Sequence, residues 1–221
     1  MTAIVFDTET TGLQEAKIIE AAWMRPADIH DLFTLNDCYN ERFDPGKPIS
    51  PAAMAVHHIL DEDLVGKRPS HEFTLPADTQ YIIGHNVDFD WQVVGSPDVK
   101  RVCTLALSRM VWPQLESHNL SALLYYLSAD RNSTREKLKN AHSALADVES
   151  CLLLLFHLVA ALNPPSWEAL WLMSEQARIP TVMPFGKHRG QPISSIPADY
   201  KRWLLNQPDI DPYLIKALGG K

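Results

Sequence analysis

The chain has 221 residues, of which 46% are hydrophobic and 21% are charged, so it is long enough to bury one full core and to carry an appendage. Its 20 Lys and Arg stand against 27 Asp and Glu, a formal net charge of −7, which excludes a protein that holds polyanions by bulk positive charge. The N-terminus lacks the basic and then apolar pattern of a signal sequence, and the apolar run 152–156 is too short to span a bilayer. We therefore expect a cytoplasmic protein with no membrane partner.

The three cysteines, Cys38, Cys103 and Cys151, are scattered along the chain. They are odd in number and show neither a metal-binding nor a disulfide spacing. Reduced, buried thiols are the expectation, as is typical of a reducing compartment.

The first predicted element is a buried strand over residues 3–7, an apolar run that ends before Thr10-Thr11-Gly12. Alternation places Asp7 and Glu9 on the same side of the extended chain. Two carboxylates held side by side repel each other, so such a pair persists where a cation neutralises it or where one carboxylate carries a proton. A metal is the simpler interpretation, and a solvated acidic turn is the alternative for this motif alone.

Strands are also predicted near residues 17–24, 31–43, 80–84 and 99–103. A short helix over residues 87–94 follows the strand at 80–84 and would carry Asp90 in its first turns. An acid near a helix N-terminus is favoured by the helix dipole, which gives Asp90 a structural explanation as well.

A long amphipathic helix is predicted from about residue 140 to 162, because this segment is rich in Ala and Leu and has no internal Gly or Pro. Its first turns contain His142 and Asp147, which lie on neighbouring edges of a helix, so Asp147 can face a pocket. Imidazole ordinarily titrates near 6.5, which suits His142 to proton transfer. Each residue alone has a structural alternative.

Asn163-Pro164-Pro165-Ser166 ends this helix and marks a predicted boundary between residues 1–163 and 164–221. Eight of the sixteen prolines lie beyond Asn163. In the tail we predict helices over 167–177 and 200–206 and a tight turn or small hairpin over 182–190.

The three acidic segments together resemble the DEDDh group of 3′-to-5′ exonucleases, the family of the proofreading subunit of bacterial DNA polymerase III, ribonuclease T and exonuclease X. The pattern D-x-E-T-T-G-L, then H-N-x-x-F-D, then H-x-A-x-x-D occurs here in the family's order over residues 3–160. The resemblance implies an α/β, ribonuclease H-like exonuclease fold, with a mixed sheet of about five strands flanked by helices. The tail would be a small C-terminal α+β appendage.

The resemblance also implies a site with two metal ions, Mg²⁺ or Mn²⁺, whose hard character matches carboxylate oxygens. Asp7 would bridge both ions, Glu9 and Asp147 would complete the shell of the first, and Asp90 would hold the second. His142 would take the proton from the attacking water. DNA 3′ ends are the implied substrate, RNA is an alternative, and ribonuclease T-like relatives form homodimers.

Substrate contacts follow from the same likeness. The segment 49–59 reads as a helix that begins at a proline and resembles the family's lining of the pocket for the terminal nucleotide. The implied contacts with the terminal nucleotide or its strand are those of Thr10, Leu13, Met54, His57 and Asn86. An amphipathic helix whose Met is simply core is the alternative, and His58 stands where relatives often carry Gly.

The tail motif Pro184-Phe185-Gly186-Lys187-His188-Arg189-Gly190 resembles the F-G-K-x-R-G segment of exonuclease X-like proteins. Its glycines and basic residues predict an accessory DNA contact through Lys187, His188 and Arg189, with Trp203 stacking on a base. A solvated, Gly-bounded turn and a core tryptophan are the alternatives. Residues 1–163 hold 13 Lys and Arg against 22 Asp and Glu, and residues 164–221 hold 7 against 5. Binding away from the active site should therefore be weak or depend on the tail.

Overall fold

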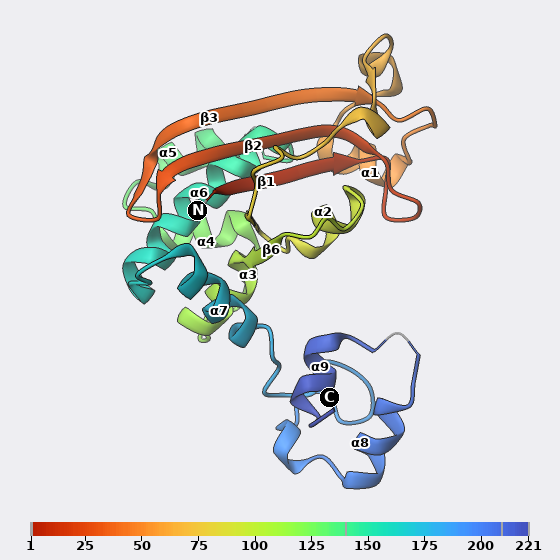
Figure 1. Cartoon of the computed structure of the whole chain (residues 1–221), viewed down its shortest axis with the longest axis vertical. Coiled ribbons are helices and arrows are strands. Elements are labelled where there is room, and N and C mark those ends of the chain that lie inside the picture. Colours follow the sequence, from red (N-terminus) through yellow and green to blue (C-terminus); the bar gives the residue numbers. More distant parts are fainter. Residues whose placement is uncertain (1, 140, 209, 221) are drawn as a thin grey trace.

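A computed structural model describes residues 2–139, 141–208 and 210–220 of the chain. Its centre is a mixed six-stranded sheet with the strand order β4-β3-β2-β1-β5-β6 (Figure 1). The strands are β1 (Ala3–Thr10), β2 (Ile18–Asp28), β3 (Asp31–Asp44), β4 (Arg68–Pro69), β5 (Tyr81–Gly84) and β6 (Lys100–Cys103). The α/β class and the five predicted strands are confirmed, and β4 is a short sixth strand at the edge.

Strand β1 lies in the interior of the sheet between β2, to which it is antiparallel, and β5, to which it is parallel. Its residues 3–6 are buried because helices or loops cover both faces at this point. The long β3 is mostly exposed. The predicted burial of the cysteines is wrong for Cys38, since it lies on this open strand, whereas Cys103 and Cys151 are buried.

Helix α6 (Ala144–Leu162) is the main helix against the sheet and contacts β1 and β2. It begins later than the residue 140 expected, and Asn140 itself lies outside the described residues. Among the described helices, α6 has the length and mean hydropathy, 1.9, of a membrane span. Its residues Leu154, Leu155 and Leu158 are nonetheless fully buried in the main hydrophobic core, as in the core helix of a globular domain.

The remaining helices connect and flank the strands. They are α1 (Pro51–His57), α2 (Asp88–Val93), α3 (Thr104–Val111), α4 (Leu120–Leu127), α5 (Arg131–Leu138), α7 (Trp167–Ala177), α8 (Ala198–Leu205) and α9 (Pro212–Ala217). Short 3₁₀ turns span Asp61–Leu64, Ser70–Glu72 and Ile193–Ser195. Helix α2 lies across β1 from α6, so the two helices approach the same part of that strand from different sides (Figure 1).

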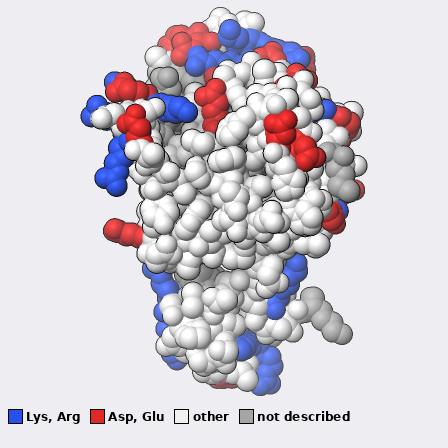
Figure 2. Space-filling model, turned by 90° about the vertical axis from the view of Figure 1, so that its left-hand side faces the viewer, with Lys and Arg blue, Asp and Glu red and all other residues white. Residues whose placement is uncertain are grey.

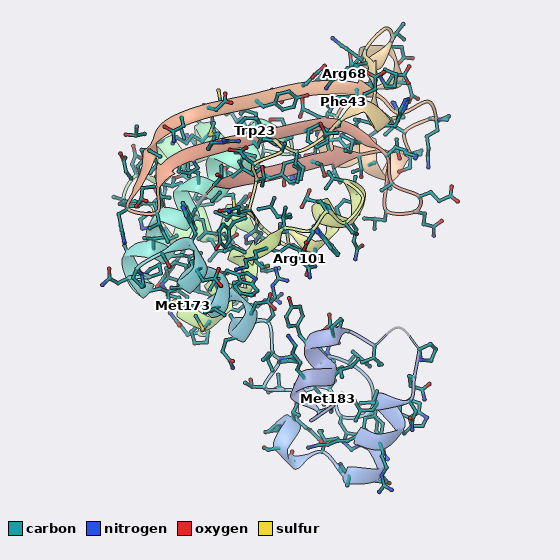
Figure 3. All side chains as sticks on the ribbon, viewed as in Figure 1. Trp23, Phe43, Arg68, Arg101, Met173 and Met183 are labelled. Carbon is teal, nitrogen blue, oxygen red and sulfur yellow. The ribbon has the colours of Figure 1, made fainter. Side chains whose placement is uncertain are left out.

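The division between the two hydrophobic cores lies later in the chain than the boundary predicted at Asn163-Pro164. Helix α7 follows the predicted boundary, yet its Trp167 and Leu170 are buried in the same core as α6. A separate hydrophobic cluster begins at Met183 and includes residues of α8 and α9. Figure 3 shows Met173 of α7 with the large unit and Met183 in the small one. On this ground we propose that the small unit, called here the C-terminal unit, consists of residues 181–220.

The C-terminal unit follows the end of α7 in the chain and lies apart from the sheet (Figure 1). Its β content among the described residues is a single bridge between Val182 and Pro192, where a turn or small hairpin over 182–190 was expected. The helix predicted over 200–206 is α8, which begins two residues earlier.

Candidate active site

Strand β1 delivers the first two acidic side chains. Along its second half the buried residues Thr8 and Thr10 alternate with the partly open Asp7 and Glu9. The period of two therefore points both carboxylates to the same side of the sheet, as the sequence predicted.

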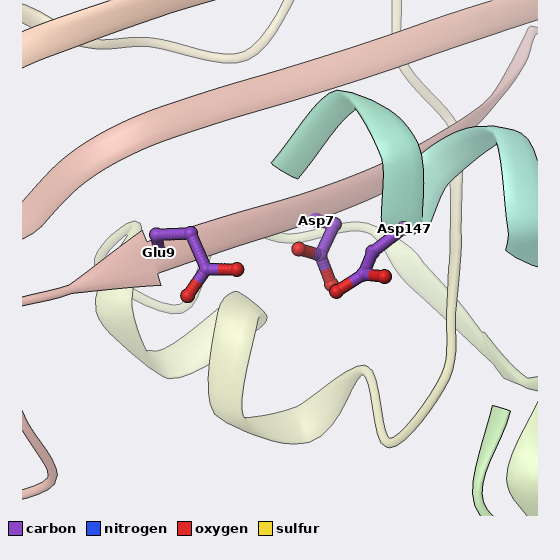
Figure 4. A group of neighbouring side chains, drawn as sticks. All are labelled: Asp7, Glu9 and Asp147. Atoms are coloured by element: carbon purple, nitrogen blue, oxygen red, sulfur yellow. The ribbon is translucent and has the colours of Figure 1, made fainter. Parts of the chain in front are cut away.

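Helix α6 delivers the third acid. Asp147 lies in its first turn, and one carboxylate oxygen from each of Asp7, Glu9 and Asp147 lies within 4.8 Å of the other two. Figure 4 shows the carboxylates of Asp7 and Asp147 facing each other while Glu9 reaches toward them from the same strand. Residues 140 positions apart in the sequence thus share one acidic pocket.

Repulsion and burial disfavour charge on this cluster. The pKa of Asp7 is raised well above its ordinary value, first by burial and then by the neighbouring Asp90 and Asp147. Burial, Asp147 and Glu20 raise the pKa of Glu9 to about 8. Burial also raises the pKa of Asp147, although the nearby His142 opposes that change. Without a cation the cluster holds protons that ordinary carboxyls would have lost at neutral pH.

Asp90 lies near these acids, because its charge raises the pKa of both Asp7 and Glu9. It is buried on α2 and accepts two hydrogen bonds from Thr8, one from the backbone N–H at 3.0 Å and one from the hydroxyl at 2.7 Å. Burial raises the pKa of Asp90 to about 6, while the bonds from Thr8 act in the opposite direction. Both bonds go to Oδ1, so the second carboxylate oxygen is not engaged by Thr8.

His142 does not lie on α6. The helix begins at Ala144, with Ser143 as its N-cap, and His142 precedes it with a φ of 67° and an exposed side chain. Its charge and its backbone both act on Asp147, so it lies at the edge of the acidic pocket. An exposed imidazole beside the pocket can exchange protons with solvent.

Glu20 was not predicted and contributes to the site from β2. It is buried, accepts a 2.8 Å hydrogen bond from the N–H of Ala144 at the start of α6, and pairs with Arg42 at 3.1 Å. Glu20 therefore fixes the backbone between His142 and Asp147. The signal in the sequence was one acid inside the apolar run of residues 18–24.

A cavity of about 300 Å³ adjoins the acidic cluster, because Glu9 lines both. Of the predicted substrate residues, Thr10, Leu13 and His57 line this cavity, and Leu13 is highly exposed. Phe89 of α2 lines it too. The volume lies at the lower end of the range for small-ligand sites.

Met54 and Asn86 are not among the residues that line this cavity. Met54 packs against the hydrophobic cluster formed by Ile19, Ile49, Ile59 and Leu64, which matches the core alternative. Asn86 is exposed and borders a different groove, between α3 and the C-terminal unit.

Helix α1 forms one wall of the cavity. Ser50 caps its N-terminus, and Gly12 lies so close that a Cβ atom there would come within 2.9 Å of the Ser50 hydroxyl. The helix ends at His58, whose φ of 58° is left-handed, the conformation that glycine adopts most easily. The local backbone is therefore the one that Gly at this position would favour.

His57 presents a buried nitrogen in the cavity wall. Its Nδ1 accepts a hydrogen bond from the N–H of Ile59 at 3.0 Å, and its Nε2 is buried without a hydrogen-bond partner among the described residues. Burial lowers the pKa of His57, which favours the neutral ring. Because Nδ1 is an acceptor, the neutral ring carries its proton on Nε2. The backbone of Thr10 lies close enough to the ring to raise the pKa of His57 against the larger effect of burial.

The donor set fits hard divalent cations. Carboxylate oxygens are the ligands that Mg²⁺ and Mn²⁺ prefer, and a nearby positive charge would oppose the burial and repulsion that raise the pKa of these groups. The described structure therefore agrees with a cation at Asp7, Glu9 and Asp147, with Asp90 available beside them.

The chain matches known proteins over most of its length. Residues 4–155 match the family model described as "Exonuclease" (RNase_T). The chain is 31% identical over 212 residues to exodeoxyribonuclease 10 of Escherichia coli (strain K12), which covers 93% of this chain and 91% of that protein. It is also 31% identical over 170 residues to the PolC-type DNA polymerase III of Lacticaseibacillus paracasei, across 70% of this chain and 11% of that one.

Solved structures share the fold. The structure of exonuclease X in complex with 5′-overhanging duplex DNA superimposes with a TM-score of 0.61 and 26% identity, covering 78% of this chain and 99% of that chain. An E. coli exonuclease I–single-stranded DNA complex, 19% identical, has a TM-score of 0.61 and covers 95% of this chain and 60% of that one, and it supports the fold alone.

Proposed function

The chain belongs to the exonuclease family, and on that premise we propose that it is a metal-dependent 3′-to-5′ exonuclease that hydrolyses DNA and releases 5′-mononucleotides. The observation that carries the proposal is the convergence of three carboxylates, with one oxygen of each within 4.8 Å of the others, beside a cavity that Glu9 also lines. A binding module gains nothing from a cluster whose members repel one another. A nuclease needs it, because its substrate is a polyanion. We place the enzyme in the cytoplasm, in DNA repair or turnover.

Asp7, Glu9 and Asp147 would hold one divalent cation, and Asp7 with Asp90 a second. When bound, such ions lower the pKa of a water ligand and stabilise negative charge on the attacked phosphate and the leaving oxygen. Thr8 orients Asp90 through its two hydrogen bonds, and Glu20 fixes the start of the helix that carries Asp147.

His142 would act as the general base. Its exposed imidazole accepts a proton from the attacking water while the water oxygen forms a bond to phosphorus. The bond between phosphorus and the 3′ oxygen of the preceding nucleotide breaks, and that oxygen takes up a proton. The products are a 5′-mononucleotide and a strand shorter by one residue that again ends in a 3′-hydroxyl.

The cavity beside Glu9 would hold the terminal nucleotide. Phe89 and Leu13 offer apolar surface to a base, and the ring of His57 forms part of the same wall. Thr10 completes the wall next to the metal ligands. Recognition of the terminal residue without base-specific hydrogen bonds suits an enzyme that removes nucleotides of any sequence. The predicted strand contact of Asn86 stays a proposal for the part of the substrate outside this cavity.

The direct test uses 5′-labelled DNA and RNA oligonucleotides of one sequence, incubated with the wild type, with Asp7→Ala and with Glu149→Ala. Each reaction contains Mg²⁺, Mn²⁺ or EDTA, and the product ladder is read by denaturing electrophoresis. Glu149 is an exposed residue of α6, the helix that carries Asp147, and serves as the control for loss of one acid outside the acidic pocket.

We expect the wild type and Glu149→Ala to shorten DNA from the 3′ end with either metal, and EDTA or Asp7→Ala to abolish this. The ratio of DNA to RNA rates decides between a deoxyribonuclease and an RNA-trimming enzyme. Absence of shortening of either polymer with any metal would refute the proposal and favour a binding or scaffold role.

A further inference from the structure

The C-terminal unit carries a surface that the active site does not use. It combines a turn and residues of α8, and we call it the tail surface. Its residues are Lys187, His188, Arg189, Tyr200, Arg202 and Trp203. The hydrophobic cluster beneath this unit is separate from the main core, so the surface belongs to a small unit with its own packing.

Three rings of the tail surface form a continuous row. The rings of His188 and Tyr200 lie 4.6 Å apart at an angle of 69°, and those of Tyr200 and Trp203 lie 5.4 Å apart at 35°. Trp203 is 53% exposed at the end of the row, so the alternative of a core tryptophan is wrong. Phe185, in the same turn, is 44% exposed. Exposed aromatic rings can stack on the bases of a single strand.

Positive charge surrounds this row. Residues 182–206 contain four Lys and Arg and one acidic residue. Among the described ion pairs, none involves Lys187, Arg189 or Arg202. The face of the C-terminal unit in Figure 2 shows blue side chains along its edges and little red, whereas the large unit above it shows both colours. The tail surface thus combines an exposed Trp203, at the end of a row whose other two rings are partly buried, with cations that take no part in the described ion pairs.

The turn is held rigidly against α8. Gly186 has a φ of +72°, and a Cβ atom there would come within 2.9 Å of the Tyr200 hydroxyl, so only glycine fits without a shift. The N–H groups of Arg189, Gly190 and Gln191 donate to carbonyls of the same turn. These backbone groups are therefore not free to cradle a phosphate, and the side chains must supply the contacts.

The C-terminal unit is also tied to the catalytic one. The guanidinium of Arg178, at the end of α7, donates to the Tyr213 hydroxyl of α9 at 2.6 Å and pairs with Asp88 of α2 at 3.1 Å. Asp88 directly precedes Phe89 and Asp90, which belong to the proposed active site. A ligand on the C-terminal unit would therefore be held at a fixed place relative to the catalytic centre.

From these observations we propose that the tail surface binds a single-stranded segment of the DNA substrate, outside the active-site cavity. Cations would contact phosphates, and Trp203 with Tyr200 would stack on bases, the combination typical of sequence-independent strand binding. The large unit has more acidic than basic residues, so its overall charge does not attract a strand. An acidic protein would also suit cations beside aromatic rings, and the binding experiment below separates the two partners. The inference rests on the proposed function, which supplies the strand.

Length dependence tests the proposal. The full-length Asp7→Ala protein, which we expect not to cleave, is titrated against a fluorescent oligo(dT) 20-mer and a trinucleotide by fluorescence anisotropy. The test variant adds Lys187→Ala, Arg189→Ala and Trp203→Ala. We expect the Kd for the 20-mer to rise about tenfold or more, and the slope of log K against log salt to fall by about 1.4, roughly 0.7 per lost phosphate contact. The Kd for the trinucleotide should not change.

A matched control removes Arg131 and Arg135, two exposed cations of α5 in the large unit, and should leave the 20-mer Kd within about twofold. Trp203→Phe keeps an aromatic ring, so it should raise the Kd for the 20-mer less than Trp203→Ala does. Circular dichroism and thermal unfolding establish that each variant is folded, as the exposure of the substituted side chains leads us to expect.

In the otherwise wild-type enzyme, the triple substitution should lower kcat/KM for the 20-mer and leave that for a dinucleotide unchanged. Unchanged binding of the 20-mer would overturn the proposal and assign the surface to another partner, such as a protein. Equal loss for the trinucleotide and the 20-mer would overturn it as well. If the wild type cleaves neither substrate, the proposed function fails, while the binding titration still decides the role of the tail surface.

Discussion

Replacement of Glu9 by glutamine should make the metal-free protein more stable at alkaline pH. In the folded protein the carboxyl of Glu9 has a pKa raised from 4.5 to about 8, chiefly by burial and by the charge of Asp147. The unfolded chain loses this proton above pH 4.5, whereas the folded chain keeps it until about pH 8. Stability is therefore full below pH 4.5 and is lost as the pH rises toward 8.

The difference between a pKa of 4.5 and one of about 8 corresponds to about 5 kcal/mol, at about 1.4 kcal/mol per pH unit. Glu9 is partly open to solvent, so screening reduces the expected penalty to about 2 kcal/mol. For a chain of this size, that free energy corresponds to a Tm higher by roughly 4–8 °C in Glu9→Gln.

The assay is thermal unfolding in EDTA at pH 5 and pH 8.5, followed by circular dichroism, for the wild type, Glu9→Gln and the exposed control Glu149→Gln. The gain of Glu9→Gln should be present at pH 8.5 and small at pH 5. Addition of Mg²⁺ at pH 8.5 should raise the Tm of the wild type more than that of Glu9→Gln, because the wild type keeps all of its ligands.

An equal Tm for the wild type and Glu9→Gln in EDTA at pH 8.5 would show that repulsion within the acidic cluster does not destabilise the folded protein. A lower Tm for the variant would refute the reasoning more strongly, because it would mean that Glu9 stabilises the fold without a metal. Either outcome would remove the electrostatic argument for a cation at this site.

Three further substitutions separate the roles assigned to other residues. His142→Ala should lower kcat by about 10²–10⁴-fold while the Kd for Mg²⁺, measured by calorimetry, changes little, and a variant with full kcat would contradict the role of base. Glu20→Ala should lower the free energy of unfolding by about 2 kcal/mol and reduce kcat. Glu20→Gln keeps an acceptor for the N–H at the start of α6 and should retain most of the stability and most of kcat. Equal losses in the two variants would argue against that hydrogen bond. Phe89→Ala should raise KM for DNA severalfold with little change in kcat, and an unchanged KM would exclude Phe89 from the nucleotide pocket.

Local patterns were sufficient for the sheet and for the acidic set. The alternation in β1 predicted that Asp7 and Glu9 share a side, and the resemblance of three short motifs supplied Asp147 and Asp90. These features are encoded in residues that are close in sequence or in motifs of fixed spacing. The first residue of α6 was harder to predict from the sequence. Ser143 can cap this helix only if the chain before it leaves the helical direction, and His142 does so with its positive φ.

Long-range packing decided the rest. Glu20 acquires its role only when β2 brings it to the first turn of α6, and Phe89 becomes a cavity wall only when α2 lies beside α1. Helix α7 belongs to the large core although prolines precede it, because its Trp167 is buried in that core. The sequence by itself determined which side chains can bind metal and which strands can pair. The tertiary structure decided which groups meet, since contacts and burial depend on distances between segments that no local pattern records.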